Sequence, residues 1–275
     1  MTAYLWIDGQ LLAEPDARVS PFDHGLLTGD GVFETMRVYG GVPFAARRHL
    51  DRLARSAAVL GLPLPDPLEL AAAMAQVVAA NGLDEGRLRV TVTGGPAPLG
   101  SARGAAAPTV IVAGGPMSPW PPATPVVVVP WPRNERGALA GVKSISYGEN
   151  VVALGYALER GAGEAVFPNL AGNLCEGTGS NVFVGAGGRL VTPPLSSGCL
   201  AGVTRELLLG LVDVVEEDLP AGALAEADEA FVSSSTREVQ PVSSVDGRPL
   251  PAAPGPLTAA AAAAFARLVA ADADP

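Results

Sequence analysis

Hydrophobic and polar positions follow two different periods along the chain. Alternation with a period of two predicts short strands, and apolar positions that recur every three to four residues predict amphipathic helices. The expected strands are Tyr4–Leu12 (two strands around a turn at Asp8–Gly9), Gly31–Val38, Val42–Phe44, Leu88–Thr93, Thr109–Val112, Glu164–Phe167, Asn181–Val184, Arg189–Val191 and Glu229–Ser233. The expected helices are Arg47–Leu60, Asp66–Asn81, Asn150–Arg160, Val203–Val212 and Thr258–Ala270. Because strands and helices mix without a regular βαβ repeat, the pattern predicts an α+β fold.

A proline-rich segment interrupts this pattern near the middle of the chain. In residues 116–124 the prolines are spaced too closely for a helix or a sheet to form between them. We therefore expect a small α/β domain at residues 1–115, an interdomain linker at 116–124 and a larger domain at 125–275.

Composition and charge exclude several classes of protein. Hydrophobic residues make up 48% of the chain and charged residues 17%, which excludes a disordered chain, a coiled coil and a collagen-like fibre. The net charge of −10 argues against a nucleic-acid partner, because phosphate neutralisation needs a basic face. The long uncharged segment 104–132 is broken by prolines, so we do not expect it to span a membrane. Two cysteines and two histidines without ligand spacing predict neither a disulfide framework nor a metal site. We expect a cytoplasmic protein.

The basic residues point to one unusual position. The chain has 18 of them, and Lys143 is the single lysine among arginines. Arginine stays protonated in proteins, whereas a lysine amine can lose its proton and attack a carbonyl group. The lysine is either a surface residue retained by chance or a residue with a chemical function.

Two further motifs favour the chemical function. Glu176 precedes a turn of small residues, Gly177–Ser180, that leads into an expected strand. Val203 and Thr204 follow Gly202 at the start of an expected helix, where free backbone N–H groups and a threonine hydroxyl make an anion site. A lysine for an aldehyde, a carboxylate for a ring nitrogen and a helix start for a phosphate together indicate a pyridoxal 5′-phosphate pocket.

At this point the chain resembles a known family, the fold-type IV pyridoxal-phosphate enzymes. These include branched-chain aminotransferases, D-amino acid aminotransferases, (R)-amine transaminases and 4-amino-4-deoxychorismate lyases. The resemblance is carried by seven collinear motifs: Gly29–Arg37, His49–Leu53, Lys143–Tyr147, Glu176–Phe183, Thr192–Ser196, Gly202–Arg205 and Pro241–Gly247. It implies a two-domain α+β fold whose larger domain holds a barrel-like sheet, and a homodimer with a shared active site.

The resemblance also implies a role for each matching residue. Lys143 is the residue that holds the cofactor covalently and moves the substrate Cα proton, and Glu176 is the partner of the ring nitrogen. The other residues expected to bind the cofactor are Arg52, Val203, Thr204 and Ser235 at the phosphate and Tyr147 at the phenolic oxygen. The residues expected on the substrate side are Phe33, Thr35, Arg37, Arg136 and Thr236.

The motifs specify the cofactor more closely than the reaction. We expect an aminotransferase that moves an amino group between an amino acid and a 2-oxo acid, with D-amino acids favoured over L-amino acids and with (R)-amines as further donors. Thr35 stands where branched-chain enzymes have glycine, and a threonine at this place occurs in 4-amino-4-deoxychorismate lyases, so a lyase that eliminates pyruvate stays an alternative. A protein that binds the cofactor without catalysis is an alternative of another class. Arg37, Arg89, Arg133 and Arg136 are the candidates for binding a substrate carboxylate.

Overall fold

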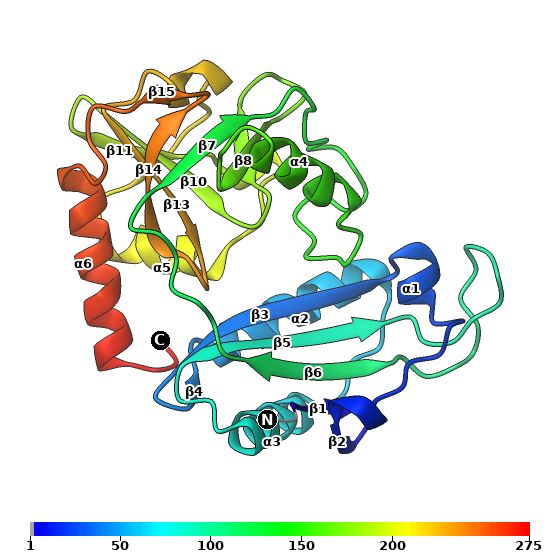
Figure 1. The fold of residues 1–275 in the computed structure, drawn as a ribbon. Helices are drawn as coiled ribbons and strands as arrows, with labels where there is room; N and C mark the ends of the chain where they lie inside the picture. The colour runs from blue at the N-terminus through cyan, green and yellow to red at the C-terminus, as the bar shows by residue number, and fades with distance from the viewer. Residues whose placement is uncertain (1–2) are drawn as a thin grey trace. The chain divides into compact units, whose positions relative to one another are not determined.

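The computed structural model describes residues 3–275 and has the mixed α and β architecture that the pattern predicts (Figure 1). The chain divides into two compact units. The first comprises Met1–Ser118, Val142–Tyr147 and Asp272–Pro275, and the second comprises Pro119–Gly141 and Gly148–Ala271. The division falls within the proline-rich segment, and the short segment that carries Lys143 belongs to the first unit.

The first unit is built on a six-stranded antiparallel sheet with the strand order β2-β1-β6-β5-β3-β4. Its strands are β1 (Tyr4–Ile7), β2 (Gln10–Ala13), β3 (Gly31–Tyr39), β4 (Val42–Pro43), β5 (Gly86–Thr93) and β6 (Val110–Gly115). Its helices are α1 (His24–Thr28), α2 (Ala46–Leu60) and α3 (Pro67–Asn81). The helix α2 packs on β3, and α3 packs on β1 and β6, around a core of apolar side chains from the sheet and both helices.

Local chemistry explains the start of α3 and the ends of both α2 and α3. The side chain of Asp66 accepts a hydrogen bond from the Leu68 N–H at 2.7 Å and so caps the start of α3. Gly61 and Gly82 end α2 and α3 in the left-handed conformation, which favours glycine. Leu53 on α2 is fully buried, as its position on the apolar face of the expected helix requires.

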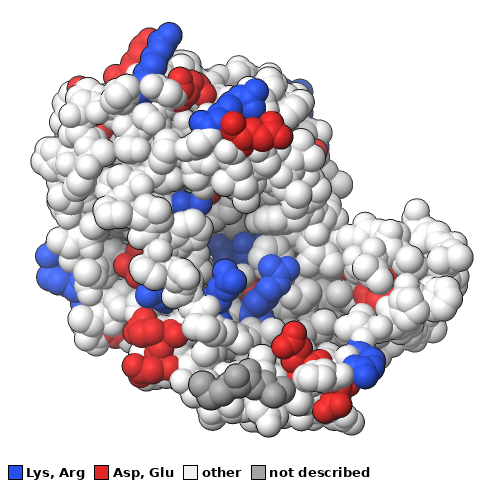
Figure 2. All heavy atoms as spheres, viewed as in Figure 1, with Lys and Arg blue, Asp and Glu red and all other residues white. Residues whose placement is uncertain are grey.

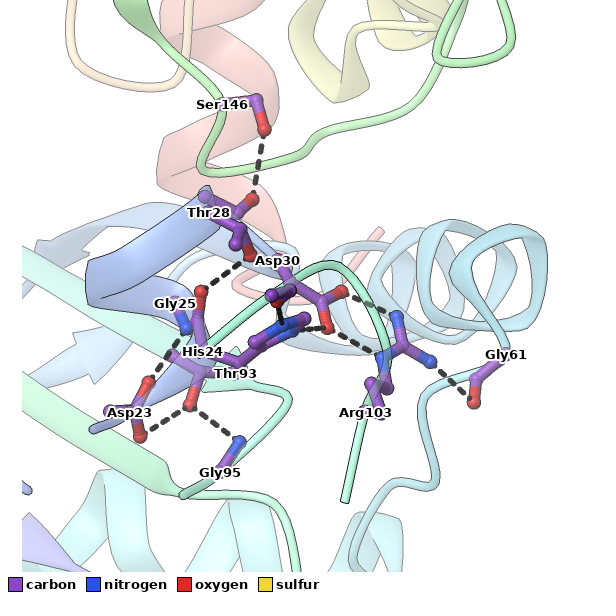
Figure 3. Close-up of polar contacts among 12 residues, drawn as sticks. Asp23, His24, Gly25, Thr28, Asp30, Gly61, Thr93, Gly95, Arg103 and Ser146 are labelled. Carbon is purple, nitrogen blue, oxygen red and sulfur yellow. Dashed lines mark hydrogen bonds and ion pairs between the residues drawn. The ribbon is translucent and has the colours of Figure 1, made fainter. Parts of the chain in front are cut away.

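The helix α1 was not expected from the sequence, because it is about one turn long, contains Gly25 and ends at Gly29. It is capped by Asp23, whose side chain accepts from the Gly25 N–H at 2.8 Å (Figure 3). The other oxygen of Asp23 accepts from Thr93 at 2.9 Å and from Thr109 at 2.6 Å, so α1 is joined to the ends of β5 and β6. The hydrogen bonds of the buried Asp23 carboxylate therefore hold α1 in place, whereas a longer helix would be held by packing of a regular apolar face.

A second polar group holds the loop between β5 and β6. The ring of His24 contacts Asp30 through Nδ1 at 2.7 Å, and Arg103 donates to both Asp30 oxygens (Figure 3). Nε2 of His24 contacts the Gly100 carbonyl at 2.8 Å. We call His24, Asp30 and Arg103 the loop cluster. Both ring nitrogens face acceptors, and the hydrogen bonds to Asp30 and Gly100 raise the pKa of His24 above its ordinary value.

The second unit holds a curled nine-stranded mixed sheet (Figure 1). The strand order is β12-β11-β10-β13-β14-β7-β8-β9, and β15 pairs with β14. The strands are β7 (Thr124–Val128), β8 (Glu164–Pro168), β9 (Leu174–Gly177), β10 (Asn181–Ala186), β11 (Arg189–Thr192), β12 (Val215–Glu216), β13 (Glu229–Ser234), β14 (Glu238–Val245) and β15 (Arg248–Pro249). The helices are α4 (Gly148–Leu158), α5 (Val203–Leu211) and α6 (Pro256–Ala271).

The strand β14 is central in this sheet, although the sequence pattern did not predict it. It pairs with β13 on one side and with β7 on the other, and Pro241 lies within it opposite Phe231. A proline within a run normally argues against a central strand, because it cannot donate to the ladder. Here the register shifts between Val242 and Ser244 on the β7 side, so the ladder is irregular close to the proline.

Charged side chains are sparse on the visible face, and both signs occur there (Figure 2). Within residues 3–275 no helix combines the length and the apolar character that crossing a bilayer requires. Met1 and Thr2, the first residues of the expected small domain, lie outside the described part of the chain.

Candidate active site

The segment that carries Lys143 runs beside the start of β3. The Phe33 N–H donates to the Lys143 carbonyl at 3.1 Å, and the Ile145 N–H donates to the Gly31 carbonyl at 2.9 Å. The Lys143 N–H donates to the Ser56 hydroxyl on α2 at 3.2 Å. Bonds to a strand on one side and to a helix on the other fix the backbone of the lysine.

Three of the residues expected at the site lie together in the first unit. The Lys143 amino nitrogen is 4.3 Å from the centre of the Phe33 ring. The Tyr147 ring meets Phe33 edge to face at 5.3 Å between centroids. Lys143 and Tyr147 are half-buried and Phe33 is buried, so the amine lies against aromatic surface.

Arg52 is buried on α2, and its guanidinium is held by a carboxylate. It donates to Glu34 from Nε at 2.8 Å and from Nη2 at 2.7 Å, and Nδ1 of His49 lies 2.7 Å from the same carboxylate. Burial alone would raise the pKa of Glu34, but the Arg52 charge and the hydrogen bonds from Arg52 and His49 outweigh it and lower the pKa to about 2. Ser56 accepts a hydrogen bond from the Lys143 N–H and lies one helical turn after Arg52 on α2. The backbone of Lys143 therefore contacts the face of α2 that carries Arg52.

The expected substrate residues of β3 share one face of the sheet with a further arginine. Thr35 pairs with Arg89 of β5, and the Arg89 guanidinium lies 3.7 Å from the centre of the Phe33 ring. Burial lowers the pKa of Arg89. Arg37, two residues beyond Thr35, forms an ion pair with Glu85 at 3.3 Å. Arg89, and not Arg37, therefore contacts the Phe33 ring, which the Lys143 amine also contacts.

Glu176 lies near the end of β9 in the second unit, and both of its oxygens have partners. Oε2 accepts from the Leu200 N–H at 2.9 Å, and Oε1 forms an ion pair with Nε of Arg133 at 3.3 Å. Arg133 also lies over the Phe167 ring at 4.1 Å and donates to Asn150 at 3.2 Å. Arg133, a candidate for a substrate carboxylate, is thus engaged by Glu176 in this structure.

The start of α5 has the features of an anion site. Gly202 is the N-cap residue and supplies no side chain to the first-turn N–H groups, which include those of Val203 and Thr204. A Cβ on Gly202 would lie 2.0 Å from Oδ1 of Asn181, so any other residue here requires the Asn181 side chain to move. Both Val203 and Thr204 are buried.

The remaining expected residues lie on loops of the second unit. Ser235 and Thr236 form the turn between β13 and β14 and are half-buried, and Arg136 is exposed in the loop after β7. Cys175 and Cys199 are buried free thiols, and burial raises the pKa of Cys199 to about 11. Over residues 3–275 no group of His, Cys, Asp or Glu side chains is arranged to hold a metal ion.

Sequence reasoning missed the residues that hold the site residues in place. In the sequence, Glu34 looks like an ordinary polar residue of an expected strand. Nothing in the sequence shows that Arg52 on α2 forms an ion pair with it. The signal that was available is the spacing of His49 and Arg52, which lie three residues apart and therefore share a helix face.

Comparison with known proteins identifies the family. Residues 31–245 match the family model described as amino-transferase class IV. A protein of Methanocaldococcus jannaschii, named as a candidate branched-chain-amino-acid aminotransferase, is 36% identical over 89% of this chain and 88% of its own length. A D-alanine aminotransferase of Bacillus licheniformis is 32% identical over 91% of this chain and 92% of its own length.

Solved structures agree with the sequence matches. The branched-chain amino acid aminotransferase of Escherichia coli superposes with a TM-score of 0.92 at 30% identity and covers 98% of this chain and 95% of its own. The branched-chain amino acid aminotransferase of Thermobaculum terrenum, solved in its PLP form, gives a TM-score of 0.87 at 26% identity over 98% of this chain and 94% of its own. The chain is a member of the class IV aminotransferase family, the fold-type IV enzymes that its motifs resemble.

Proposed function

We propose that the protein moves an amino group between an amino acid and a 2-oxo acid, with Lys143 as the catalytic residue. Pyridoxal 5′-phosphate is the cofactor, and when bound it supplies an aldehyde carbon and a ring that accepts electron density. The observation that carries the proposal is the position of the single lysine, whose amine lies against Phe33 and Tyr147 on a backbone fixed by β3 and α2.

The residues present fit this cofactor. An aldehyde needs an amine, a pyridine nitrogen needs a carboxylate, and a phosphate needs N–H donors. Lys143 offers the amine, Glu176 offers a half-buried carboxylate, and the uncapped start of α5 offers donors at Val203 and Thr204. Gly202 packs against the Asn181 side chain, which fixes the backbone at the start of α5.

Each residue then has a defined task. The Lys143 amine would hold the aldehyde carbon and, once the substrate amine had displaced it, would take the proton from the substrate Cα and deliver it to that aldehyde carbon. Glu176 keeps the ring nitrogen protonated, and the contacts from Arg133 and the Leu200 N–H hold its carboxylate in one orientation. Tyr147 contacts the same Phe33 ring as Lys143 and would donate a hydrogen bond to the phenolic oxygen.

Four residues are proposed to bind the phosphate. Arg52 supplies a guanidinium whose orientation Glu34 fixes through two parallel hydrogen bonds. Val203 and Thr204 supply backbone N–H groups and a hydroxyl, and Ser235 supplies a second hydroxyl.

We propose D-amino acids as the amino donors, with (R)-amines as further donors. This choice is supported by the D-alanine aminotransferases of Staphylococcus epidermidis and Bacillus licheniformis, which are 30% and 32% identical to the chain. Branched-chain L-amino acids are a second candidate, which the 36% identity to the Methanocaldococcus jannaschii protein favours. On the substrate side we propose Phe33, Thr35, Arg37 and Thr236, with Arg136 and Arg89 as further carboxylate ligands.

A lyase reaction is the remaining candidate. A structure from Legionella pneumophila named as a candidate 4-amino-4-deoxychorismate lyase superposes with a TM-score of 0.87 at 26% identity. Thr35 on the Phe33 face of the sheet supports this candidate. The two reactions differ in product, since a lyase releases pyruvate and an aromatic amine whereas a transaminase releases the 2-oxo acid of the donor.

A panel of single turnovers tests the proposal. The cofactor-loaded protein is mixed in turn with D-alanine, L-leucine, an (R)-amine and aminodeoxychorismate, and the cofactor absorbance and the released product are measured. We expect D-alanine to bleach the visible band and to release one equivalent of 2-oxo acid per site. Pyruvate from aminodeoxychorismate alone would assign the lyase reaction instead. We further propose a cytoplasmic homodimer, for which light scattering of the loaded protein should give twice the chain mass.

A further inference from the structure

Glu164 is a buried carboxylate that the proposed chemistry does not use. It is the first residue of β8, and 1% of its surface is exposed. Oε1 accepts from the N–H groups of Ala165 at 3.0 Å and Thr178 at 3.1 Å and from the Thr178 hydroxyl. Oε2 accepts from the Ser180 hydroxyl at 3.0 Å and pairs with Nη2 of Arg237 at 3.5 Å. Both oxygens are therefore occupied, and every donor except the neighbouring Ala165 N–H belongs to another segment of the second unit.

The first of these segments is the turn that follows Glu176. Thr178 and Ser180 are the second and fourth residues after Glu176. Gly177 packs directly against the group, since a Cβ there would lie 2.2 Å from the Ser180 hydroxyl and 3.2 Å from the Glu164 carboxyl carbon. The position of the Glu176 backbone is thus set by the Glu164 carboxylate on one side of the residue and by its pairing with Phe167 in β8 on the other.

The second segment is the turn that carries Ser235 and Thr236. Arg237 ends this turn, and its guanidinium donates to the Gly163 carbonyl at 2.8 Å and to Gln240. The same guanidinium lies over the Trp120 ring at 3.9 Å, which leaves it little freedom to move. Its ion pair with Glu164 therefore joins the turn after β13 to the turn after β9.

We propose that Glu164 is a positioning residue that holds the Glu176 carboxylate and the Ser235–Thr236 turn in a fixed relation within the second unit. The inference rests on the proposed roles of Glu176 and Ser235. The buried Glu164 carboxylate has five contacts and cannot move without leaving some of these donors unpaired. It therefore fixes the two turns that supply the donors in one position relative to each other. A Glu176 carboxylate that is held in this way meets the ring nitrogen without having to reorganise.

The test replaces Glu164 by glutamine, which keeps the shape and removes the charge that Arg237 needs. The cofactor is labelled with ¹⁵N at the ring nitrogen, and its chemical shift is followed against pH in the loaded protein. We expect the ring-nitrogen pKa in Glu164→Gln to fall by at least one unit. In the same variant kcat should fall about tenfold while KM for the amino donor stays within threefold, because Glu164 does not touch the substrate.

A matched control is available in the same unit. Glu229 is 3% exposed and caps α6 by accepting from the N–H groups of Leu257 at 3.0 Å and Thr258 at 2.7 Å. Glu229→Gln also removes a buried carboxylate, but Glu229 contacts neither the turn after Glu176 nor the turn that carries Ser235 and Thr236. It should lower the melting temperature and leave the ring-nitrogen pKa at the wild-type value, which separates positioning from a general loss of stability.

A milder pair of variants keeps the proposal testable if Glu164→Gln does not fold. Thr178→Val removes one hydroxyl from Glu164 and keeps the shape, and Thr178→Ser restores the hydroxyl. We expect Thr178→Val to lower the ring-nitrogen pKa and Thr178→Ser to return it. A wild-type ring-nitrogen pKa in both Glu164→Gln and Thr178→Val overturns the inference.

Glu176→Gln distinguishes this failure from failure of the proposed function. If Glu176→Gln lowers the ring-nitrogen pKa and Glu164→Gln does not, Glu176 keeps its role and Glu164 loses its own. If Glu176→Gln has no effect, the proposed role of Glu176 is wrong, and the inference for Glu164 fails with it.

Discussion

Glu34→Gln is the change that probes the first unit most directly. Glu34 is fully buried and lies between Arg52 and His49, and the substitution keeps its shape while removing its charge. Arg52 would then lie buried without the carboxylate that holds its Nε and Nη2. We expect the variant to be less stable and to bind the cofactor phosphate more weakly, because the Arg52 guanidinium loses its fixed orientation.

The size of the effect follows from the pKa of Glu34. The ordinary pKa is 4.5, and contacts in the folded protein lower it to about 2. Because one pKa unit is worth about 1.4 kcal/mol, this difference corresponds to roughly 3 kcal/mol of stability at neutral pH. Breaking a buried ion pair by removing one partner costs about 3–5 kcal/mol in other proteins, which agrees with this figure.

The pH dependence gives a second, independent signature. A carboxylate whose pKa is lowered on folding contributes its full stability above its unfolded pKa and loses it as the pH falls through the folded value. The Glu34 contribution is therefore complete above about pH 4.5 and disappears towards pH 2. The stability difference between wild type and Glu34→Gln should shrink over that window, because glutamine does not titrate.

The assay is urea unfolding of protein freed of cofactor, at pH 7 and at steps down to about pH 3, with Glu85→Gln as the control. Glu85 pairs with Arg37 at 3.3 Å, and its side chain is 55% exposed, so its loss should cost under about 1 kcal/mol. A Glu34→Gln variant within about 1 kcal/mol of wild type at pH 7 would show that Glu34 does not stabilise the buried Arg52. A stability difference that stays constant from about pH 5 to pH 3 would show the same.

Two further predictions concern the second unit and the loop cluster. Gly202→Ala places a Cβ 2.0 Å from Oδ1 of Asn181, so we expect at least tenfold weaker cofactor binding in a fluorescence titration, whereas Gly210→Ala, which meets no atom within 4 Å, should bind as wild type does. Hydrogen bonds to Asp30 and Gly100 raise the pKa of His24 in the folded protein. Protonated His24 therefore holds the loop between β5 and β6 in place at pH values below the ordinary pKa of 6.5, and this stabilisation is lost as the pH rises through the folded pKa. Trypsin should accordingly cut after Arg103 faster, relative to other sites, as the pH rises. A ratio that does not change with pH, or one that changes equally in His24→Gln, would contradict this assignment.

Elements with a clear apolar period could be predicted from the sequence. The helices α2 and α3 and the strands β3 and β5 lie where the periodicity placed them, to within two residues at each end, because each buries a regular apolar face. The misses have physical causes. The helix α1 is held by the Asp23 carboxylate rather than by apolar packing, and β14 contains Pro241, which normally excludes a central strand.

The residues of the candidate site also fall into two groups, those that the sequence predicts and those that it does not. Lys143 and Glu176 could be proposed from the sequence because the chemistry requires those residue types and the motifs are local. The groups that hold the site could not, since Glu34 meets Arg52 and Glu164 meets Arg237 only through tertiary packing. Arg133 shows the limit most clearly, because an arginine that reads as a substrate ligand forms an ion pair with Glu176.

Lys143 is proposed to carry out amino transfer with the bound cofactor. The most direct measurement is a single turnover of the loaded protein with an amino donor, in which the visible cofactor band and the released 2-oxo acid are followed together for wild type and Lys143→Ala. We expect loss of the band and one equivalent of 2-oxo acid per site for wild type, and neither for Lys143→Ala with its fold intact by circular dichroism. Release of 2-oxo acid by Lys143→Ala at the wild-type rate would remove Lys143 from the catalytic role.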